Sequence, residues 1–373
     1  MTGLTGLTGL TGLTGLTGLT GLVGQSGDGS AGLTAALMTT RDGLIGPAQD
    51  PVLAAPLRGG SDAAMAHWSG KTRGLVIEAD IVSGLACAGF AEGPDGRAET
   101  SATLFATTGA EPAQRGATFE VCRTPIATFV RPTDEDFRIQ TELVLEYADL
   151  RLDRAAEIGA QIELPLAFYG LVVPLDDEAH RMTLHILSIM RSLVGKVAMM
   201  VKHQIAAVRP NAYSIQVQPM IPTPGHSALP SGHAAQAFAI ALVLAELMQA
   251  DRATRVMLLR QAARIAVNRT VAGVHFPVDS VAGLVLGRAL TEVVVARATG
   301  TGGVTPRLFD GRGVGRLDFR WADYLEDGGT PDPAADGVVT RDGAAVDLAA
   351  ARSRPLVWLW DRARAEWNCG AVA

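Results

Sequence analysis

The strongest constraint on the fold is a series of long apolar segments in the second half of the chain. Apolar residues recur at helical spacing from Leu184 to Ile205, after acidic residues that suit the start of a helix at 176–181. Three further segments are also long and largely apolar, at 234–248, 253–267 and 280–297. Charged residues interrupt them, among them Glu246, Arg264 and Arg288. We therefore expect the buried helices of a soluble bundle rather than lipid-facing spans.

Composition narrows the class of protein. The 373 residues are 48% hydrophobic and 19% charged, which can fill a core and is too apolar for a disordered chain. A net charge of −6 gives no basic field, so we expect no nucleic-acid partner. Three scattered cysteines, Cys87, Cys122 and Cys369, are too few for a disulfide framework or a zinc cluster. A Cys87–Cys122 bridge stays open, and free buried thiols are favoured.

We divide the chain into four regions. Residues 1–32 are a low-complexity tail built on seven Thr-Gly-Leu units, which lacks the basic start and continuous apolar core of a signal peptide. Residues 33–130 are rich in Gly and Ala. We expect residues 131–300 to form a helical core that holds the motifs described below, and residues 301–373 to form a C-terminal extension. We expect a soluble chain with no integral membrane span and no recognisable signal peptide, in a compartment that the sequence leaves open.

Local signals predict further elements. Short apolar runs at 75–81 and 118–122 suggest strands, with turns at 95–96 and 115–116. Thr133 and the acids after it mark the start of a helix, and a helical pattern covers 143–160. Three tryptophans near the C-terminus are interpreted as packing anchors: Trp358, Trp360 and Trp367. The expected fold class is mainly α, with a less regular N-terminal region.

Three short motifs carry the chemistry. The first runs from Lys202 to Arg209 and a following proline, and its seven-residue spacing would project both cations from one helix face. The second is Pro-Ser-Gly-His at 230–233, where Ser231 can cap an apolar helix whose free N–H groups face an anion. Alone, the first motif is typical of a solvated face and the second of an ordinary helix N-terminus.

The third motif runs from Asn268 to Asp279. His275 and Asp279 are four residues apart, so one helical turn can bring the carboxylate to the imidazole and fix its tautomer. Such a pair alone is equally typical of a structural contact. Together the motifs supply three cations, helix N–H groups and two histidines, which suits a tetrahedral oxyanion and in-line chemistry.

These motifs resemble the signature of the type 2 phosphatidate phosphatase and vanadium haloperoxidase superfamily, which reads KxxxxxxRP, PSGH and SRxxxxxHxxxD. Every internal spacing matches, and ten of the eleven defined residues match. The departure is Asn268, where the family usually has Ser. The resemblance covers residues 202–279 directly. It implies a helical bundle of the haloperoxidase and acid phosphatase type.

The resemblance also implies a role for each matching residue. Five residues would bind the anion: Lys202, Arg209, Ser231, Gly232 and Arg269. His233 would be the acid–base group. His275 would be the nucleophile on phosphorus or the one protein ligand of vanadium, and Asp279 would orient it. Asn268 would lie behind the residues that touch the anion.

The same pocket serves two reactions in this superfamily. Our first expectation is a vanadate-dependent haloperoxidase, which oxidises bromide or iodide with hydrogen peroxide to hypohalous acid. Phosphate would compete with the vanadate, and neither haem nor flavin would be needed. The length of the chain favours this reading, and so does His226, seven residues before His233, because the bromide-using enzymes have a second histidine at that place. An ordinary turn is the other interpretation of His226.

Two alternatives stand beside it. One is a soluble acid phosphatase that acts on phosphomonoesters, with His275 as nucleophile and His233 as general acid. The other is a non-catalytic oxyanion-binding protein, which the intact set of His233, His275 and Asp279 argues against. Related haloperoxidases associate, so we also expect a homo-oligomer.

Overall fold

The computed structural model describes residues 62–92, 98–108, 122–164, 166–326 and 336–368, together with residues 36, 39 and 40. The chain divides into two compact units, Met1–Leu75 and Val76–Ala373. In the first unit, helix α2 (Asp62–His67) precedes the start of α3 (Gly70–Ser83). Arg73 Nη1 joins them by donating to the carbonyls of Met65, at 3.1 Å, and Trp68, at 2.6 Å.

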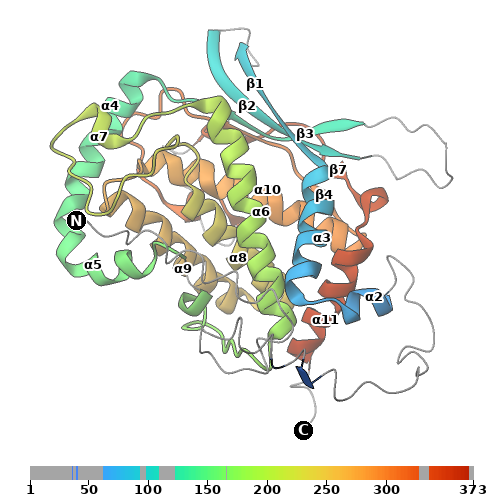
Figure 1. Cartoon of the computed structure of the whole chain (residues 1–373). Coiled ribbons are helices and arrows are strands. Elements are labelled where there is room, and N and C mark those ends of the chain that lie inside the picture. The colour runs from blue at the N-terminus through green and yellow to red at the C-terminus, as the bar shows by residue number, and fades with distance from the viewer. Residues whose placement is uncertain are drawn as a thin grey trace, which may run out of the picture. The chain divides into compact units, whose positions relative to one another are not determined.

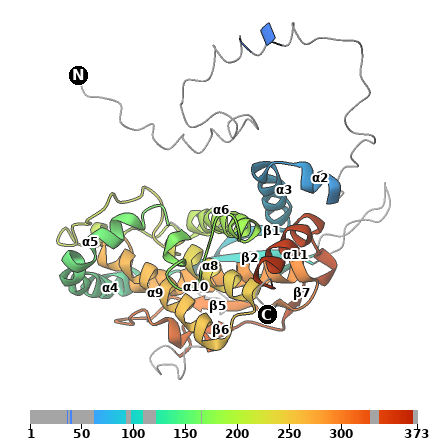
Figure 2. The ribbon, with the colours of Figure 1, turned by 90° about the horizontal axis from the view of Figure 1, so that it is seen from below.

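Long helices form the core of the second unit. Helix α8 (Gly232–Met248) lies between α6 (Arg181–Ile205) and α9 (Arg252–Val271), and α10 (Pro277–Thr299) also packs against it (Figures 1 and 2). Most side chains of α8 are apolar and buried, as expected of a helix with neighbours on several sides. The mainly α prediction is confirmed, and the four predicted apolar segments lie within these helices.

Two glycines let α10 approach α8 closely. A Cβ atom at Gly283 would lie 2.7 Å from both the Ala234 Cβ and the Ser231 carbonyl oxygen. A Cβ atom at Gly287 would collide with the Ala235 carbonyl. Any larger residue would push the two helices apart. The glycines therefore hold the start of α8, with the Pro-Ser-Gly-His motif, against the start of α10, with Asp279.

The segment before the core is helical, as the sequence predicts. Helix α4 (Asp134–Glu146) begins at Thr133, which forms a capping box with Asp136. It continues through η2 (Tyr147–Leu150) into α5 (Arg151–Ala160). Shorter helical segments are also described. They are α7 (Pro210–Tyr213) and the 3₁₀ turns η3 (Leu166–Phe168), η4 (Trp321–Asp323) and η7 (Ala349–Ala351).

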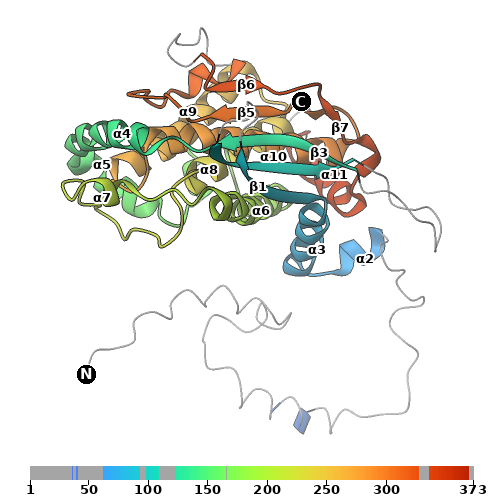
Figure 3. The same ribbon diagram turned by 90° about the horizontal axis from the view of Figure 1, so that it is seen from above.

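A five-stranded sheet flanks the helices, in the order β1-β2-β3-β5-β6 (Figure 3). Its strands are β1 (Leu85–Glu92), β2 (Ala98–Thr107), β3 (Arg123–Val130), β5 (Arg307–Asp310) and β6 (Val339–Arg341). Among the strands that the structure describes, only β3 and β5 pair in parallel, with Ala127 opposite Arg307. The helical core is thus inserted between two adjacent strands. A separate pair joins β4 (Gly303–Val304) to β7 (Val346–Asp347).

Helix α11 (Arg354–Asn368) packs against α6, α8 and α10. Trp358 and Trp360 are buried in that contact, which confirms their packing role. The Glu366 carboxylate accepts hydrogen bonds from the N–H groups of Met182 and Thr183, at 2.7 and 2.8 Å. Trp367 donates from Nε1 to Thr183 Oγ1 at 3.0 Å. The C-terminal helix therefore caps the first turn of α6.

Several local predictions are wrong. Residues 75–81 form part of α3 rather than a strand, because Ile77 and Ile81 lie four residues apart and are both buried, at helical spacing. Residues 176–180 form a turn in which Asp176 accepts from two N–H groups, and the helix begins only at Arg181.

The remaining local predictions have mixed outcomes. Cys87 and Cys122 are both free thiols, as favoured. The expectation that they are buried is wrong, because Cys87 is half-buried and Cys122 is exposed. Cys369 lies outside the described residues, as do the predicted turns at 95–96 and 115–116 and residues 118–121 of the predicted strand.

Candidate active site

The three motifs meet at one cavity of about 370 Å³. Its lining includes both motif histidines, three cations and the helix-start glycine: Lys202, Arg209, Gly232, His233, Arg269 and His275. His226 also lines it. The side chains of Lys202, Arg209, Arg269 and His275 are each at most 5% exposed. Residues up to 73 positions apart in the sequence therefore share one buried polar pocket.

Lys202 and Arg209 reach the pocket from different segments, so the prediction that they share one helix face is wrong. Helix α6 ends at Ile205, and Ala206 adopts a left-handed conformation with φ of 50°. Arg209 stands in extended backbone immediately before α7. The two cations meet because the chain turns back, not because of helical spacing.

Main-chain carbonyls of the 226–228 loop orient these cations. Lys202 Nζ donates to the carbonyls of Ser227, at 2.6 Å, and Ala228, at 2.8 Å. An ammonium has three donors, so one N–H of Lys202 is left for a ligand. Arg209 Nε donates to the His226 carbonyl at 3.2 Å, and its Nη1 donates to the Val274 carbonyl at 2.7 Å.

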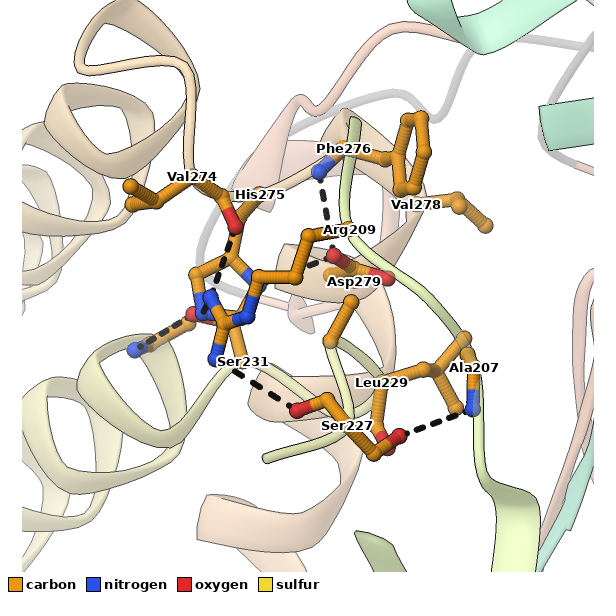
Figure 4. Close-up of polar contacts among 12 residues, drawn as sticks. Ala207, Arg209, Ser227, Leu229, Ser231, Val274, His275, Phe276, Val278 and Asp279 are labelled. Atoms are coloured by element: carbon orange, nitrogen blue, oxygen red, sulfur yellow. Dashed lines mark hydrogen bonds and ion pairs between the residues drawn. The ribbon is translucent and has the colours of Figure 1, made fainter. Parts of the chain in front are cut away.

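The imidazole of His275 lies between Arg209 and Asp279 (Figure 4). Its Nδ1 is 2.8 Å from Asp279 Oδ2, and its Nε2 is 3.2 Å from Arg209 Nη1. Because a guanidinium can only donate, Nε2 carries the lone pair and Nδ1 carries the proton. This tautomer aims an unprotonated ring nitrogen at the cations of the pocket. Burial and the nearby positive charges lower the pKa of His275, so the ring is neutral.

Asp279 is completely buried behind His275. Oδ2 accepts a second hydrogen bond, from the Phe276 N–H at 3.0 Å, because Asp279 lies in the first turn of α10. His275 precedes that helix, so the contact is made across the helix start rather than along a helical turn. Burial raises the pKa of Asp279 to about 7, and the Phe276 N–H, Lys202 and Arg209 oppose this rise.

The Pro-Ser-Gly-His motif forms the start of α8, as predicted. Ser231 is the N-cap: its Oγ accepts from the Ala234 N–H at 3.3 Å. Ser231 is buried behind the cavity wall, whereas Gly232 and His233 line the cavity. A Cβ atom at Gly232 would meet nothing within 4 Å, so this position is open toward the pocket.

His233 contacts the segment that follows α5. Its Nε2 is 3.1 Å from the Gln161 carbonyl oxygen and 3.0 Å from the Ile162 carbonyl oxygen, so Nε2 carries a proton that it donates to them. Burial lowers the pKa of His233 to about 4, and the charge of Arg269 adds to this effect. The ring is therefore neutral at pH 7 in the ligand-free molecule.

Arg269 supplies the third buried cation. Its Nη2 donates to the Ile158 carbonyl at 3.3 Å and to Gln161 Oε1 at 3.4 Å. Among the described residues, its Nε and Nη1 have no hydrogen-bond partner, although both are buried. Buried donors without partners are costly, so an anion in the cavity would satisfy them. Neighbouring Asn268 donates from Nδ2 to Gln161 Oε1 at 2.9 Å, behind the pocket.

His226 is exposed at the mouth of the cavity. Its Nδ1 lies 3.2 Å from Arg209 Nη2 and also 3.2 Å from the Ser227 carbonyl oxygen, so it accepts from the guanidinium in one tautomer and donates to the carbonyl in the other. Burial lowers the pKa of His226, and the charges of Lys202 and Arg209 add to this effect. The geometry thus assigns His226 a contact with the guanidinium of Arg209.

The charge balance of the pocket favours an anion with two negative charges. Lys202, Arg209 and Arg269 face a single buried carboxyl group, Asp279. Burial lowers the pKa of Lys202 to about 7 and raises that of Asp279 to about 7. If a proton passes from Lys202 to Asp279, the four groups keep the same net charge, so the excess of positive charge stays. Among the residues that the structure describes, no three or more His, Cys, Asp or Glu side chains gather as a metal-binding group. The site can therefore hold a tetrahedral oxyanion beside the unprotonated Nε2 of His275, whose lone pair accepts from Arg209 Nη1 in the ligand-free geometry.

Comparison with known proteins matches this region to a family. The family model described as "PAP2 superfamily" matches residues 182–299, which include all three motifs. Residues 182–299 form a PAP2 superfamily core. The predicted resemblance is confirmed at the level of the superfamily, without support for its bromide-specific pattern.

Other comparisons add little. No curated protein matches the chain in sequence. One similar solved structure is the crystal structure of the first transmembrane PAP2 type phosphatidylglycerolphosphate phosphatase from Bacillus subtilis. It is 19% identical, covers 41% of this chain and 78% of that chain, and has a TM-score of 0.25. A likeness at that score carries no argument about the fold or the substrate of this chain.

The prediction of a soluble chain without a membrane span is wrong. Within the described residues, Arg181–Tyr213 contains one helix with a mean hydropathy of 1.5, long and apolar enough to cross a membrane. Half of the apolar stretch is buried inside the fold, and core helices of soluble proteins meet the same criterion. This helix overturns the prediction of a chain without a membrane span, and it does not identify the compartment of the protein.

The sequence did not reveal several groups around the PAP2 site. The carbonyls that hold Lys202 and His233 come from residues 227–228 and 161–162, and any residue type could have supplied them. The side chain of Gln161 is completely buried beside Arg269. In a single sequence, nothing distinguishes a glutamine buried beside an arginine from an exposed glutamine at the end of a surface helix.

Proposed function

We propose that this chain is a phosphatase that hydrolyses phosphomonoesters through a phosphohistidine intermediate at His275. One observation carries the proposal: the unprotonated Nε2 of His275 faces a pocket with three buried cations and one buried carboxylate. Membership of residues 182–299 in the PAP2 superfamily supports phosphatase-type chemistry. The alternative phosphatase prediction is thus better supported than the haloperoxidase prediction.

In the first step, His275 Nε2 attacks phosphorus and the bond from phosphorus to the ester oxygen breaks. Lys202, Arg209 and Arg269 neutralise the three non-bridging oxygens, on which the charge of the transition state is spread. The N–H groups at the start of α8 face the same anion. The imidazole becomes positively charged as the new bond forms, and the buried carboxylate of Asp279 stabilises it through Nδ1–H.

The leaving oxygen needs a proton, and we assign its delivery to His233. In the ligand-free geometry, Nε2 of His233 donates to two carbonyls. Proton delivery therefore requires either a ring rotation toward the ester or a second proton on Nδ1. A bound phosphate ester favours the second proton, because its negative charge raises the pKa of a neighbouring histidine.

In the second step, water attacks the phosphohistidine and the bond between phosphorus and Nε2 breaks. His233, now deprotonated, accepts the proton of that water. The products are inorganic phosphate and a neutral His275. The cations hold the phosphoryl oxygens through both steps, so the enzyme begins the next cycle when phosphate leaves.

Vanadate is the cofactor that the haloperoxidase resemblance implies. The unpartnered Nε and Nη1 of Arg269 and the lone pair of His275 fit a tetrahedral oxyanion, whether phosphate or vanadate. Lys202, Arg209, Gly232, Arg269 and His275 would hold it, and bound vanadate would supply a centre that activates peroxide. Neither the family match nor the position of His226 favours halide chemistry, so we expect vanadate to act as a competitive inhibitor.

The proposal is tested by trapping the intermediate. Protein mixed rapidly with p-nitrophenyl phosphate is denatured in alkali, which preserves phosphohistidine, and is analysed by peptide mass spectrometry. We expect a phosphoryl group on His275, and none in the His275→Gln variant. Turnover without any phosphorylated histidine, or with phosphate on another residue, would refute this mechanism.

A further inference from the structure

Gln161 occupies an unusual position for a residue at the end of a surface helix. It follows α5 directly, yet its side chain is completely buried. Its carbonyl oxygen accepts from the Leu164 N–H at 3.1 Å and from His233 Nε2 at 3.1 Å. The backbone of Gln161 is therefore fixed against the pocket, which presents its amide side chain in one place.

The orientation of that amide follows from its partners. Nε2 of Gln161 donates to Glu157 Oε1 at 3.0 Å, and a carboxylate can only accept. Oε1 must then face the donors, which are Asn268 Nδ2 at 2.9 Å and Arg269 Nη2 at 3.4 Å. All of these partners agree on a single orientation, so the amide cannot flip without losing them.

The network is anchored on its far side. Glu157 accepts three hydrogen bonds from Arg264, at 2.7–2.9 Å. Arg154 Nη1 donates to Asn268 Oδ1 at 3.0 Å. A continuous set of hydrogen bonds thus runs from surface charges to Arg269, whose other two nitrogens have no partner among the described residues. The network thus holds Nη2 of Arg269, and the donors Nε and Nη1 are left for the anion.

We infer that Gln161 is a positioning residue for Arg269: it fixes the guanidinium so that Nε and Nη1 face the bound oxyanion. Asn268 takes part by holding Oε1 of Gln161. This role rests on the proposed oxyanion site, although it does not require that the bound anion be hydrolysed. Gln161 itself lines no part of the cavity.

The test measures the affinity for orthovanadate by titration calorimetry, in a cycle of two substitutions. Gln161→Leu keeps the approximate size of the side chain and removes its acceptor. Arg269→Lys keeps the charge and loses the fork that reaches Gln161. We expect Gln161→Leu alone to weaken binding about tenfold, the value of one hydrogen bond to a charged group. In the Arg269→Lys background we expect a change of less than about twofold.

Gln140→Leu is the matched control. Gln140 is also fully buried: it accepts from the Val278 N–H and donates to the carbonyls of Gly315 and Leu317, and none of these hydrogen bonds involves Arg269. Its loss should lower the thermal midpoint and change vanadate affinity by less than about twofold. A tenfold loss in this control would overturn the inference, because any buried amide would then have the same effect.

Two further outcomes would overturn it: no change in affinity in Gln161→Leu, or the same loss with Arg269→Lys as without it. If Gln161→Leu does not fold, Asn268→Ser removes the neighbouring amide donor and leaves Gln161 in place. It should weaken vanadate binding about threefold in the wild-type background and have no effect in the Arg269→Lys background. An equal loss in both backgrounds, or none in the wild type, would again refute the role.

The result separates this inference from the proposed function. Coupling between Gln161 and Arg269 in vanadate binding can be present in a protein that hydrolyses no phosphomonoester. Conversely, hydrolysis through phosphohistidine with independent effects of the two substitutions would leave the function intact and remove the role of Gln161.

Discussion

His275 Nδ1 lies 2.8 Å from Asp279 Oδ2, and the same oxygen accepts the Phe276 N–H at 3.0 Å. The carboxylate that orients the imidazole is therefore also the group that satisfies the start of α10. Because α10 is pressed against α8 through Gly283 and Gly287, the orientation of His275 is tied to the packing of two core helices. The nucleophile of the proposed reaction is positioned by the fold itself, before any substrate binds.

Replacing Asp279 with Asn should disable this arrangement. An amide can donate to Nδ1, which would move the ring proton to Nε2 and remove the nucleophilic lone pair. We expect kcat to fall about 10³- to 10⁴-fold, the scale found when a carboxylate partner of a catalytic histidine is neutralised, with little change in KM. Steady-state hydrolysis of p-nitrophenyl phosphate measures both constants.

Asp251→Asn is the control. Asp251 also caps a helix, α9, and among the described contacts its side chain accepts from Thr254 and from no residue of the pocket. It should leave both kinetic constants within about twofold of the wild type. If Asp279→Asn were as active as this control, the tautomer assigned to His275 would be incorrect.

The position of Arg209 predicts a clear difference between two substitutions. Arg209→Lys removes the guanidinium that contacts His275 Nε2 and lines the cavity, and kcat/KM should fall about 10²- to 10³-fold. His226→Ala removes only one neighbour of Arg209, which keeps its bonds to the His226 and Val274 carbonyls, so a loss of about tenfold or less is expected. Equal losses would mean that His226 acts on the substrate directly.

The lowered pKa of His233 predicts an acidic pH profile. With a pKa of about 4, free His233 carries no positive charge near neutrality. The second pKa of a phosphate monoester is near 6, so below about pH 6 the ester itself brings the proton that the reaction needs. Above about pH 6, kcat/KM should fall roughly tenfold per pH unit, because the fraction of complexes in which His233 and the ester together carry this extra proton falls tenfold per unit. A profile that is flat from about pH 5 to 8 would contradict this account.

Much of the core could be predicted from the sequence because its signals are local. The apolar segments at helical spacing correspond to α6, α8, α9 and α10, and Thr133 and Ser231 cap helices as their side chains indicate. The motif spacings were sufficient to group Lys202, Arg209, His233, Arg269 and His275, although the turn after Ile205 that brings Arg209 to the pocket was not foreseen.

The features that escaped prediction depend on contacts distant in the sequence. The parallel pairing of β3 with β5 joins Ala127 to Arg307, and the Ala- and Thr-rich strands give weak alternation. Gln161 is buried because α5 is laid against α9, which a single sequence does not reveal. The apolar length of α6 was underestimated: the interrupting charges Glu246, Arg264 and Arg288 lie in α8, α9 and α10, not in α6.

The central claim, that the pocket performs phosphoryl transfer, is tested most directly by one paired assay on protein purified without phosphate. One portion, free of vanadate, receives p-nitrophenyl phosphate, and the other is loaded with orthovanadate and receives hydrogen peroxide, bromide and a chromogenic halogen acceptor. We predict phosphate release that added vanadate inhibits competitively, and no bromination. Bromination that depends on vanadate, without phosphate release, would contradict the account.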